Sequence, residues 1–195
     1  MQNVLTDRIT KSDFSEFTLR RAARIGLFVL FTAVSGQLAV YIPYTPVPIT
    51  MQTLFVVLAG IVLGPRDGFY AMAGYLALGL SGMPVFAGFA FGPAVLLGPT
   101  GGFLMAFPAA ALLAGIISSS GGDRIIGTAF SAAAGIMIIL AMGTVSIAFI
   151  AGVSLHQAAS LAAVPFLPGE VIKLALACLI IRPGSSFRRT GMLKR

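Results

Sequence analysis

The chain has 195 residues, of which 57% are hydrophobic and only 10% are charged. Soluble domains carry about 25% charged residues, so this chain has too few charges to cover a water-exposed globule, and intrinsic disorder needs the opposite bias. The single cysteine, Cys178, excludes an internal disulfide and a cysteine-based zinc site. The net charge of +7 does not indicate nucleic-acid binding, because the basic residues do not gather on one soluble face.

Three long segments, residues 25–65, 68–122 and 125–169, contain no Asp, Glu, Lys or Arg. A membrane-spanning helix needs about 20 apolar residues, so each segment is long enough for two helices. The sequence therefore predicts an all-α fold, an integral membrane bundle of six transmembrane helices. A multi-pass protein of the cell (inner) membrane is expected.

Breaks rich in glycine, proline and serine separate the expected helices. In chain order, helices are expected at residues 21–42, 49–63, 68–80, 101–118, 125–151 and 161–181, the last one broken near Pro165 and Pro168. The apolar but Gly- and Pro-rich segment 84–99 should form an outer loop or a re-entrant segment.

The charged ends of the chain define the predicted domains. These are a cytoplasmic N-terminal tail (1–20), the transmembrane domain (21–182) and a basic cytoplasmic tail (183–195). The N-terminal tail is expected to be solvated, and an amphipathic helix on the inner leaflet is the alternative.

The positions of the basic residues predict the topology. With both termini in the cytoplasm, every lysine and arginine except Lys173 falls on the inner side, and the three outer connections carry none. Because cytoplasmic segments of membrane proteins are enriched in Lys and Arg, this pattern indicates an even number of spans and two cytoplasmic termini.

Two charged residues fall inside the last expected helix. Glu170 and Lys173 are three residues apart and therefore share one helix face. A charge at the centre of a membrane helix costs about 2.5–3.5 kcal/mol, so both side chains should face the protein interior. The pair can bind a ligand or only fix helix packing, and the membrane setting favours ligand binding.

Pro168 indicates where this pair lies in the membrane. Proline suits the first turn of a helix, and a helix that restarts there directs its free N–H groups beyond its own end. From Pro168 to Arg182 the helix would be about 22 Å long, at about 1.5 Å per residue. Since Arg182 marks the inner surface, the pair should lie in the outer half, as in transporter binding sites.

Other polar and aromatic residues are weaker candidates. Gln52, at the outer end of the second helix, can donate and accept hydrogen bonds, although packing between helices is an equal alternative. Tyr75 lies deep enough in the third helix to reach a partner, whereas Tyr44 is expected at the membrane interface. Aromatic residues of the outer segment can wall an apolar pocket or plug the segment: Phe86, Phe89 and Phe91.

A stripe of small residues, Ala22 and Gly26, lies four residues apart on the first helix. Small residues let helices approach closely, so the stripe is a weak candidate for a partner-docking face. Packing inside the bundle is the alternative.

The sequence contains no motif for nucleotide, haem or zinc binding. No lysine follows a glycine, so the sequence has no P-loop, and one histidine and one cysteine give no basis for haem or zinc. No cofactor or metal is expected.

The run Gly79–Gly82 reads G-x-S-G, as in rhomboid intramembrane proteases, with His156 as a candidate base. A protease is a remote alternative, because Ser81 ends a helix whereas a rhomboid serine begins one.

Five short motifs follow one another between about residues 20 and 182. They are Pro46-Val47-Pro48-Ile49-Thr50 with Gln52-Thr53, Leu63-Gly64-Pro65-Arg66, Gly82-Met83-Pro84-Val85-Phe86, Leu97-Gly98-Pro99-Thr100-Gly101-Gly102, and Pro168-Gly169-Glu170 with Lys173. Together they resemble the BioY family, the biotin-binding S components of energy-coupling factor (ECF) transporters.

The resemblance implies six helices, two cytoplasmic termini and a pocket near the outer surface. The loop between the first two helices and the segment between the third and fourth would close that pocket. Biotin would meet these residues: Gln52, Tyr75, Phe86, Gly88, Glu170 and Lys173. The implied partners are the lipid bilayer, a transmembrane coupling protein and a pair of ABC-type ATPases, and no enzymatic reaction is implied.

The chain departs from the family at two places. The family usually has aspartate where this chain has Glu170, and the segment Gly88–Gly92 here lacks a polar side chain. The predicted function is capture of biotin at the outer side and uptake with an ATP-driven module. The alternative is a partner-free or ion-coupled transporter of another small carboxylate or vitamin.

Overall fold

The structure is a computed structural model, and it describes residues 2–43, 45–120 and 124–181. Its elements follow one another as α1 (Gln2–Gly36), β1 (Ala39–Val40), β2 (Ile49–Thr50), α2 (Gln52–Leu63), α3 (Pro65–Leu80), η1 (Ala87–Phe89), α4 (Pro93–Leu97), α5 (Gly101–Ser119), α6 (Arg124–Ala151), α7 (Leu155–Ala162), η2 (Val164–Phe166) and α8 (Leu167–Ile180). Helices dominate, as the sequence predicts. The predicted tail at 183–195 and Tyr44 lie outside the described residues.

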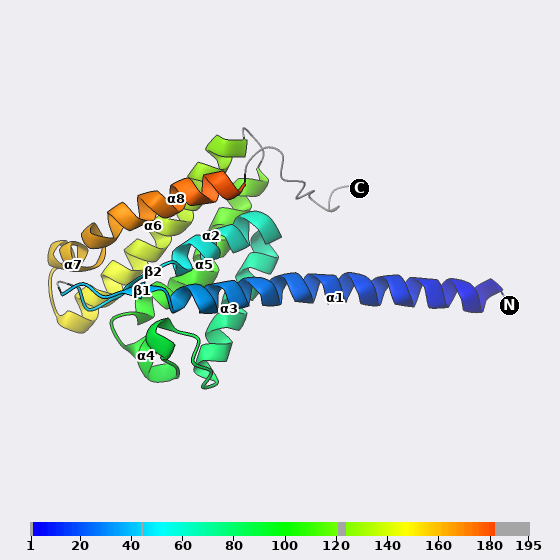
Figure 1. Cartoon of the computed structure of the whole chain (residues 1–195), viewed down its shortest axis with the longest axis horizontal. Coiled ribbons are helices and arrows are strands. Elements are labelled where there is room, and N and C mark those ends of the chain that lie inside the picture. The colour runs from blue at the N-terminus through cyan, green and yellow to red at the C-terminus, as the bar shows by residue number, and fades with distance from the viewer. Residues whose placement is uncertain (1, 44, 121–123, 182–195) are drawn as a thin grey trace.

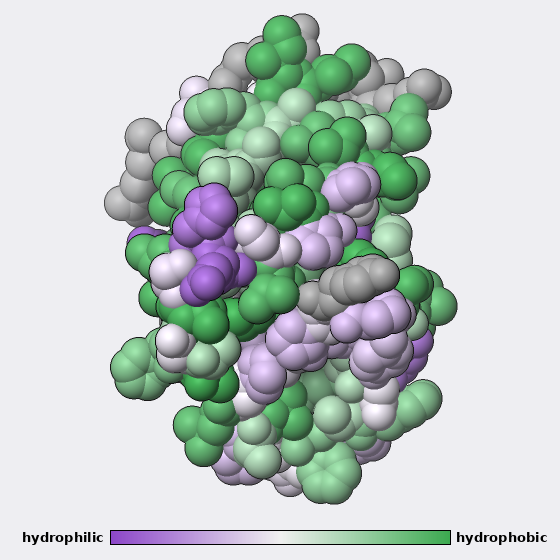
Figure 2. All heavy atoms as spheres, turned by 90° about the vertical axis from the view of Figure 1, so that its left-hand side faces the viewer, coloured by the Kyte–Doolittle hydropathy of each residue, from purple (hydrophilic) through white to green (hydrophobic). Residues whose placement is uncertain are grey.

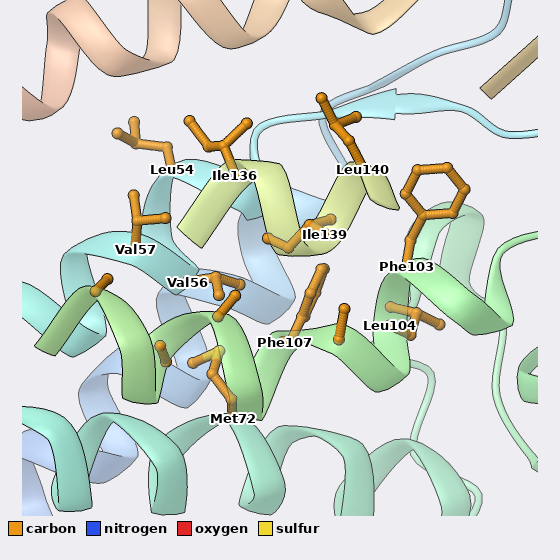
Figure 3. Packing of buried hydrophobic residues seen from close by; sticks show 14 of the residues in the cluster. Leu54, Val56, Val57, Met72, Phe103, Leu104, Phe107, Ile136, Ile139 and Leu140 are labelled. Atoms are coloured by element: carbon orange, nitrogen blue, oxygen red, sulfur yellow. The ribbon is translucent and has the colours of Figure 1, made fainter. Parts of the chain in front are cut away.

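The helices form one bundle, with α5 packed against α2, α3 and α6. The hairpin of β1 and β2 lies with α7 at one end of the bundle, and the first half of α1 projects beyond the other end (Figure 1). The core between the helices is apolar, and Phe107 of α5 points toward Ile139 of α6 in Figure 3.

Three stretches of the described chain are long and apolar enough to cross a membrane. They are Gly101–Ser119, Ile125–Ala151 and Leu155–Ile180, and α5, the first of them, is the most buried. The helix α2 is apolar but has only 12 residues, about 18 Å at about 1.5 Å per residue. The helix was expected over residues 49–63, and it begins at Gln52 and ends at Leu63.

The first helix differs from its expected limits of 21–42. It begins at Gln2 and ends at Gly36, so residues 2–20 are helical and continuous with the rest of α1. A Cβ on Gly36 would lie 2.6 Å from Nε2 of Gln52, so glycine here lets α1 approach the start of α2. After Gly36 the chain turns into the hairpin, where Ala39 pairs with Thr50 and Val40 with Ile49.

The break predicted in the last helix is present. The helix α7 ends at Ala162, η2 contains Pro165, and α8 begins at Leu167 with Pro168 in its first turn. Proline has no N–H to donate and a fixed φ, so it fits a first turn but interrupts a helix interior. The two prolines therefore separate α7 from α8.

An ion pair joins α1 to α3. Nε of Arg21 donates to both carboxylate oxygens of Asp67 at 3.0 Å, and Nη2 donates to Oδ1 at 2.5 Å. The side chains are 38% and 19% exposed. Because exposed ion pairs contribute only about 0–1 kcal/mol, this pair adds little to the stability of the contact between the two helices.

Three glycines bring α2, α3 and α5 together where α2 turns into α3. A Cβ on Gly68 would lie 2.8 Å from Cα of Gly60, and a Cβ on Gly115 would lie 2.6 Å from Cα of Pro65. The contacted atoms belong to backbone, which cannot move as a side chain does. Close helix contact at small residues is the usual source of packing energy in membrane bundles.

We predict that Gly115→Ala lowers the thermal stability of the purified protein. Alanine forms helix better than glycine by about 1 kcal/mol, but overpacking costs about 1–3 kcal/mol, so destabilisation should prevail. The matched control is Gly127→Ala in α6, where an added Cβ meets no described atom within 4 Å. The melting temperature in detergent should fall for Gly115→Ala and stay level or rise for Gly127→Ala. A rise in both variants would contradict the close packing.

Candidate functional site

A cavity of about 440 Å³ lies beneath the hairpin, between α2, α5, α6 and α8. This size lies within the range of small-molecule sites, about 300–1,000 Å³. Its walls are mostly apolar: Phe103, Leu104 and Phe107 of α5, Ile136, Ile139 and Leu140 of α6, and Phe166 of η2. The rings of Phe103 and Phe166 stack with their centroids 5.6 Å apart. The cavity can therefore hold an apolar ring against aromatic walls.

The hairpin and the outer segment form the remaining walls. Tyr41, Val47 and Thr50 line the cavity from the hairpin. From segment 84–99 come Phe86, Ala87, Ala90, Ala94, Val95, Gly98 and Pro99. The expected outer loop is thus a folded segment that includes η1 and the short helix α4.

The polar end of the cavity is formed by Thr53, Glu170 and Lys173. Nζ of Lys173 donates to Oε1 of Glu170 at 2.6 Å and to Oγ1 of Thr53 at 2.8 Å. The Thr53 hydroxyl donates to the Glu170 carboxylate, with both oxygens at 3.0 Å. Glu170 is 4% exposed and Lys173 is 3% exposed. Two opposite charges are therefore buried together beside a cavity.

The broken last helix positions this polar end. Because α8 begins at Leu167, Glu170 lies in its first turn, where the positive end of the helix dipole favours a carboxylate. Lys173 lies three residues further on the same face. An ammonium has three N–H donors and an ionised carboxylate has about four acceptor sites. Lys173 thus keeps one donor, and Glu170 keeps acceptor sites, for a molecule in the cavity.

A second set of polar contacts supports the cavity from behind. Nε2 of Gln52 donates to the Tyr75 hydroxyl at 2.5 Å, and that hydroxyl donates to the carbonyl oxygen of Val85 at 3.1 Å. Oε1 of Gln52 accepts from the Thr50 hydroxyl at 3.2 Å. The ring of Tyr75 is fully buried against Phe86. Gln52 and Tyr75 therefore tie the hairpin and α2 to the segment that starts at Val85.

The structure brings four of the six predicted pocket residues to the cavity wall. These four are Gln52, Phe86, Glu170 and Lys173. Tyr75 lies behind the wall, and Gly88 lies outside it, where a Cβ would come within 2.7 Å of the Tyr41 hydroxyl.

Several residues of the wall carry no individual functional signal in the sequence. Thr53 is part of a motif, and the structure shows that its hydroxyl links both charges. The aromatic residues of α5 and the aliphatic residues of α6 carried no signal, because apolar residues in a membrane helix can face lipid as well as a cavity. Their role becomes visible only when the helices are packed.

The small residues of the docking stripe lie on the surface of α1. Ala22 and Gly26 are exposed, and a Cβ on Gly26 would meet no described atom within 4 Å. Packing of the stripe inside the described bundle is therefore not observed.

The residues proposed for the protease alternative have ordinary local contacts. The Ser81 hydroxyl donates to the carbonyl oxygen of Leu78 at 2.8 Å, and His156 is exposed in the first turn of α7. The described residues contain no cluster of three or more His, Cys, Asp or Glu that could hold a metal ion.

The comparisons with known proteins agree with one another. The family model of the BioY family matches residues 8–189. A BioY protein of Pyrococcus horikoshii is 39% identical over 161 residues, which cover 83% of this chain and 93% of the relative. The biotin transporter BioY of Thermotoga maritima is 37% identical over 162 residues, which cover 83% of this chain and 94% of the relative.

A solved structure has the same fold. It is the crystal structure of the S-component for biotin from an ECF-type ABC transporter, with a TM-score of 0.78 and 26% sequence identity. The match covers 85% of this chain and 90% of that chain. The relatives are named for transport, and an enzymatic role such as proteolysis is not among their functions. Since both sequence and fold match over nearly the whole length, this chain belongs to the BioY family.

Proposed function

We propose that this protein is the biotin-binding subunit of an ECF-type transporter, and that it captures biotin in the cavity beneath the hairpin. One observation carries this proposal: a cavity of about 440 Å³ has aromatic walls and a buried Thr53–Glu170–Lys173 cluster at one end. Burying two charges costs several kcal/mol per ion, so their position beside a cavity supports a role in ligand binding.

The chemistry of biotin matches the two parts of the cavity. Its ureido group offers two N–H donors and a carbonyl oxygen. Glu170 can accept from a ureido N–H, and the remaining N–H of Lys173 can donate to the ureido oxygen. The apolar thiophane ring then lies against Phe103, Phe107 and Phe166, which supply rigid aromatic surface.

Six helices cross the membrane in the proposed topology, and both termini are cytoplasmic. The spans are α1, α2, α3, α5, α6, and α7 together with α8. Figure 2 shows the end with the hairpin and α7: hydrophilic residues form a band across it, between apolar surfaces on either side. Such a band fits the outer surface of the membrane, and the basic residues near both chain ends and at Arg66 and Arg124 fit the cytoplasmic side.

Energy for uptake comes from partners in this proposal. The sequence has no P-loop, so a pair of ABC-type ATPases supplies ATP hydrolysis, and a transmembrane coupling protein connects them to this subunit. The exposed face around Ala22 and Gly26 is the proposed contact with the coupling protein, because small residues let two membrane helices pack closely.

The first prediction of this proposal is that the purified chain binds biotin without any nucleotide, and does not bind riboflavin or thiamine. Titration calorimetry on protein in detergent measures this. In liposomes, biotin uptake should require the coupling protein, both ATPases and ATP. Robust uptake by the chain alone, with or without an ion gradient, would instead favour the partner-free or ion-coupled transporter.

A second prediction concerns the buried pair. Lys173→Met and Glu170→Gln should each weaken biotin binding by roughly a hundredfold or more. Breaking a buried pair costs about 3–5 kcal/mol, and about 1.4 kcal/mol is tenfold in affinity. Glu170→Asp keeps the charge and should have a mild effect.

The matched control for this pair is Asp67→Asn, which breaks the half-exposed ion pair with Arg21. It removes an ion pair away from the cavity wall, so biotin affinity should stay unchanged. If monodisperse Lys173→Met protein binds biotin as tightly as the wild type, the pair has a packing role only.

A third prediction concerns the docking face. Ala22→Leu and Gly26→Leu should reduce co-purification of the coupling protein and leave biotin affinity unchanged, because the larger side chain separates the two helices. The control is Gly127→Leu, which enlarges another glycine whose Cβ position is open. Intact complexes with both α1 variants would remove the assignment.

A further inference from the structure

The segment that forms one wall of the cavity contains a turn in an unusual conformation. Phe89 has a φ of +59°, the one described residue other than glycine with a positive φ, and it follows Gly88, whose φ is +66°. Residues with a side chain rarely adopt this region, so the surroundings must hold Phe89 there. The backbone closes the turn, because the N–H of Phe86 donates to the carbonyl oxygen of Ala90 at 3.1 Å.

One side chain outside the segment holds this turn. Oε1 of Gln37 accepts from the backbone N–H of Phe89 at 3.0 Å. Nε2 of Gln37 donates to the carbonyl oxygen of Phe86 at 3.1 Å and to that of Ala33 in α1 at 3.2 Å. A single amide thus binds both ends of the turn and connects them to α1.

The contacts of Gln37 affect the cavity wall, although Gln37 is not part of it. Gln37 lies between the end of α1 and the hairpin, and it does not line the cavity itself. The turn contributes Phe86, Ala87 and Ala90 to the cavity wall, while the hairpin contributes Tyr41. The Tyr41 hydroxyl lies next to Gly88, so the hairpin and the turn also meet there.

We propose that Gln37 is a positioning residue: its amide holds the turn of residues 86–90 over the cavity and thereby slows release of the bound ligand. The second half of this inference, slower release of the ligand, rests on the proposed function, since the ligand there is biotin. The first half, the positioning of the turn by Gln37, concerns the protein alone and needs no ligand.

Hydrogen–deuterium exchange on the ligand-free, full-length protein tests the first half. Gln37→Ala should speed exchange in the peptide that contains residues 86–90 by about tenfold. The control is Gln157→Ala, which removes another glutamine bonded to the backbone, at the Ser154 cap of α7. It should leave this peptide unchanged. Unchanged exchange in Gln37→Ala would overturn the inference whether or not biotin binds.

Biotin release measured by chase with excess unlabelled ligand tests the second half. Gln37→Ala should release biotin about tenfold faster, which corresponds to about 1.4 kcal/mol, with an unchanged melting temperature. Release at the wild-type rate in Gln37→Ala would overturn the positioning role.

Two further experiments test the positioning role of Gln37 separately from folding of the variant and from biotin binding. If Gln37→Ala does not fold, Gln37→Glu replaces it: the carboxylate accepts from Phe89 but cannot donate to Phe86, so exchange and release should again be faster, and wild-type values would overturn the inference. If the wild type binds no biotin while exchange still responds to Gln37→Ala, the proposed ligand is wrong and the positioning of the turn stands.

Discussion

The charged pair Glu170–Lys173 constrains the rest of the structure. Two opposite charges inside an apolar bundle are tolerable only when their hydrogen-bonding groups find partners. Thr53 supplies one partner by accepting from Lys173 and donating to Glu170. This requirement fixes the start of α2 against the start of α8, and the cavity opens where these two helix ends meet α5 and α6.

The break in the last helix and the start of the short second helix place the polar residues at the cavity. A straight helix through residues 155–180 would place Glu170 in its middle, away from the positive end of a helix dipole. The prolines at 165 and 168 instead place Glu170 in the first turn of α8. The helix α2 likewise begins at Gln52, so its first two residues face the hairpin and the cavity. Helix ends, rather than helix middles, form the polar part of the site.

Much of the helical fold could be predicted from the sequence, because charge-free segments and Gly- and Pro-rich breaks are strong signals. The limits of α5 and the break before α8 agree within a few residues. The limits of α1 differ from the prediction at both ends: a charged segment can continue a helix outside lipid, and the helix ends at Gly36, where α1 comes too close to Gln52 for a Cβ. The hairpin has two residue pairs, too few for a recognisable alternation.

The candidate site was predictable where a residue type is unusual for a membrane, as with Glu170 and Lys173. It was not predictable where residues are ordinary for a membrane helix, as with Phe107 or Ile139, whose orientation depends on helix packing. Gln37 shows the same limit for a polar residue. Nothing in the local sequence connects it with a turn about fifty residues away, and only the folded chain brings them together.

The ion pair between Arg21 and Asp67 adds little free energy but sets a direction. Its two-pronged geometry is compatible with only one rotation of α1 about its own axis, because successive residues of a helix are about 100° apart. Rotating α1 by the angle of one residue would break the ion pair and move Ala22 to a different side of the helix. The ion pair thus matches the rotation of α1 that leaves Ala22 and Gly26 on the exposed surface of the long first helix.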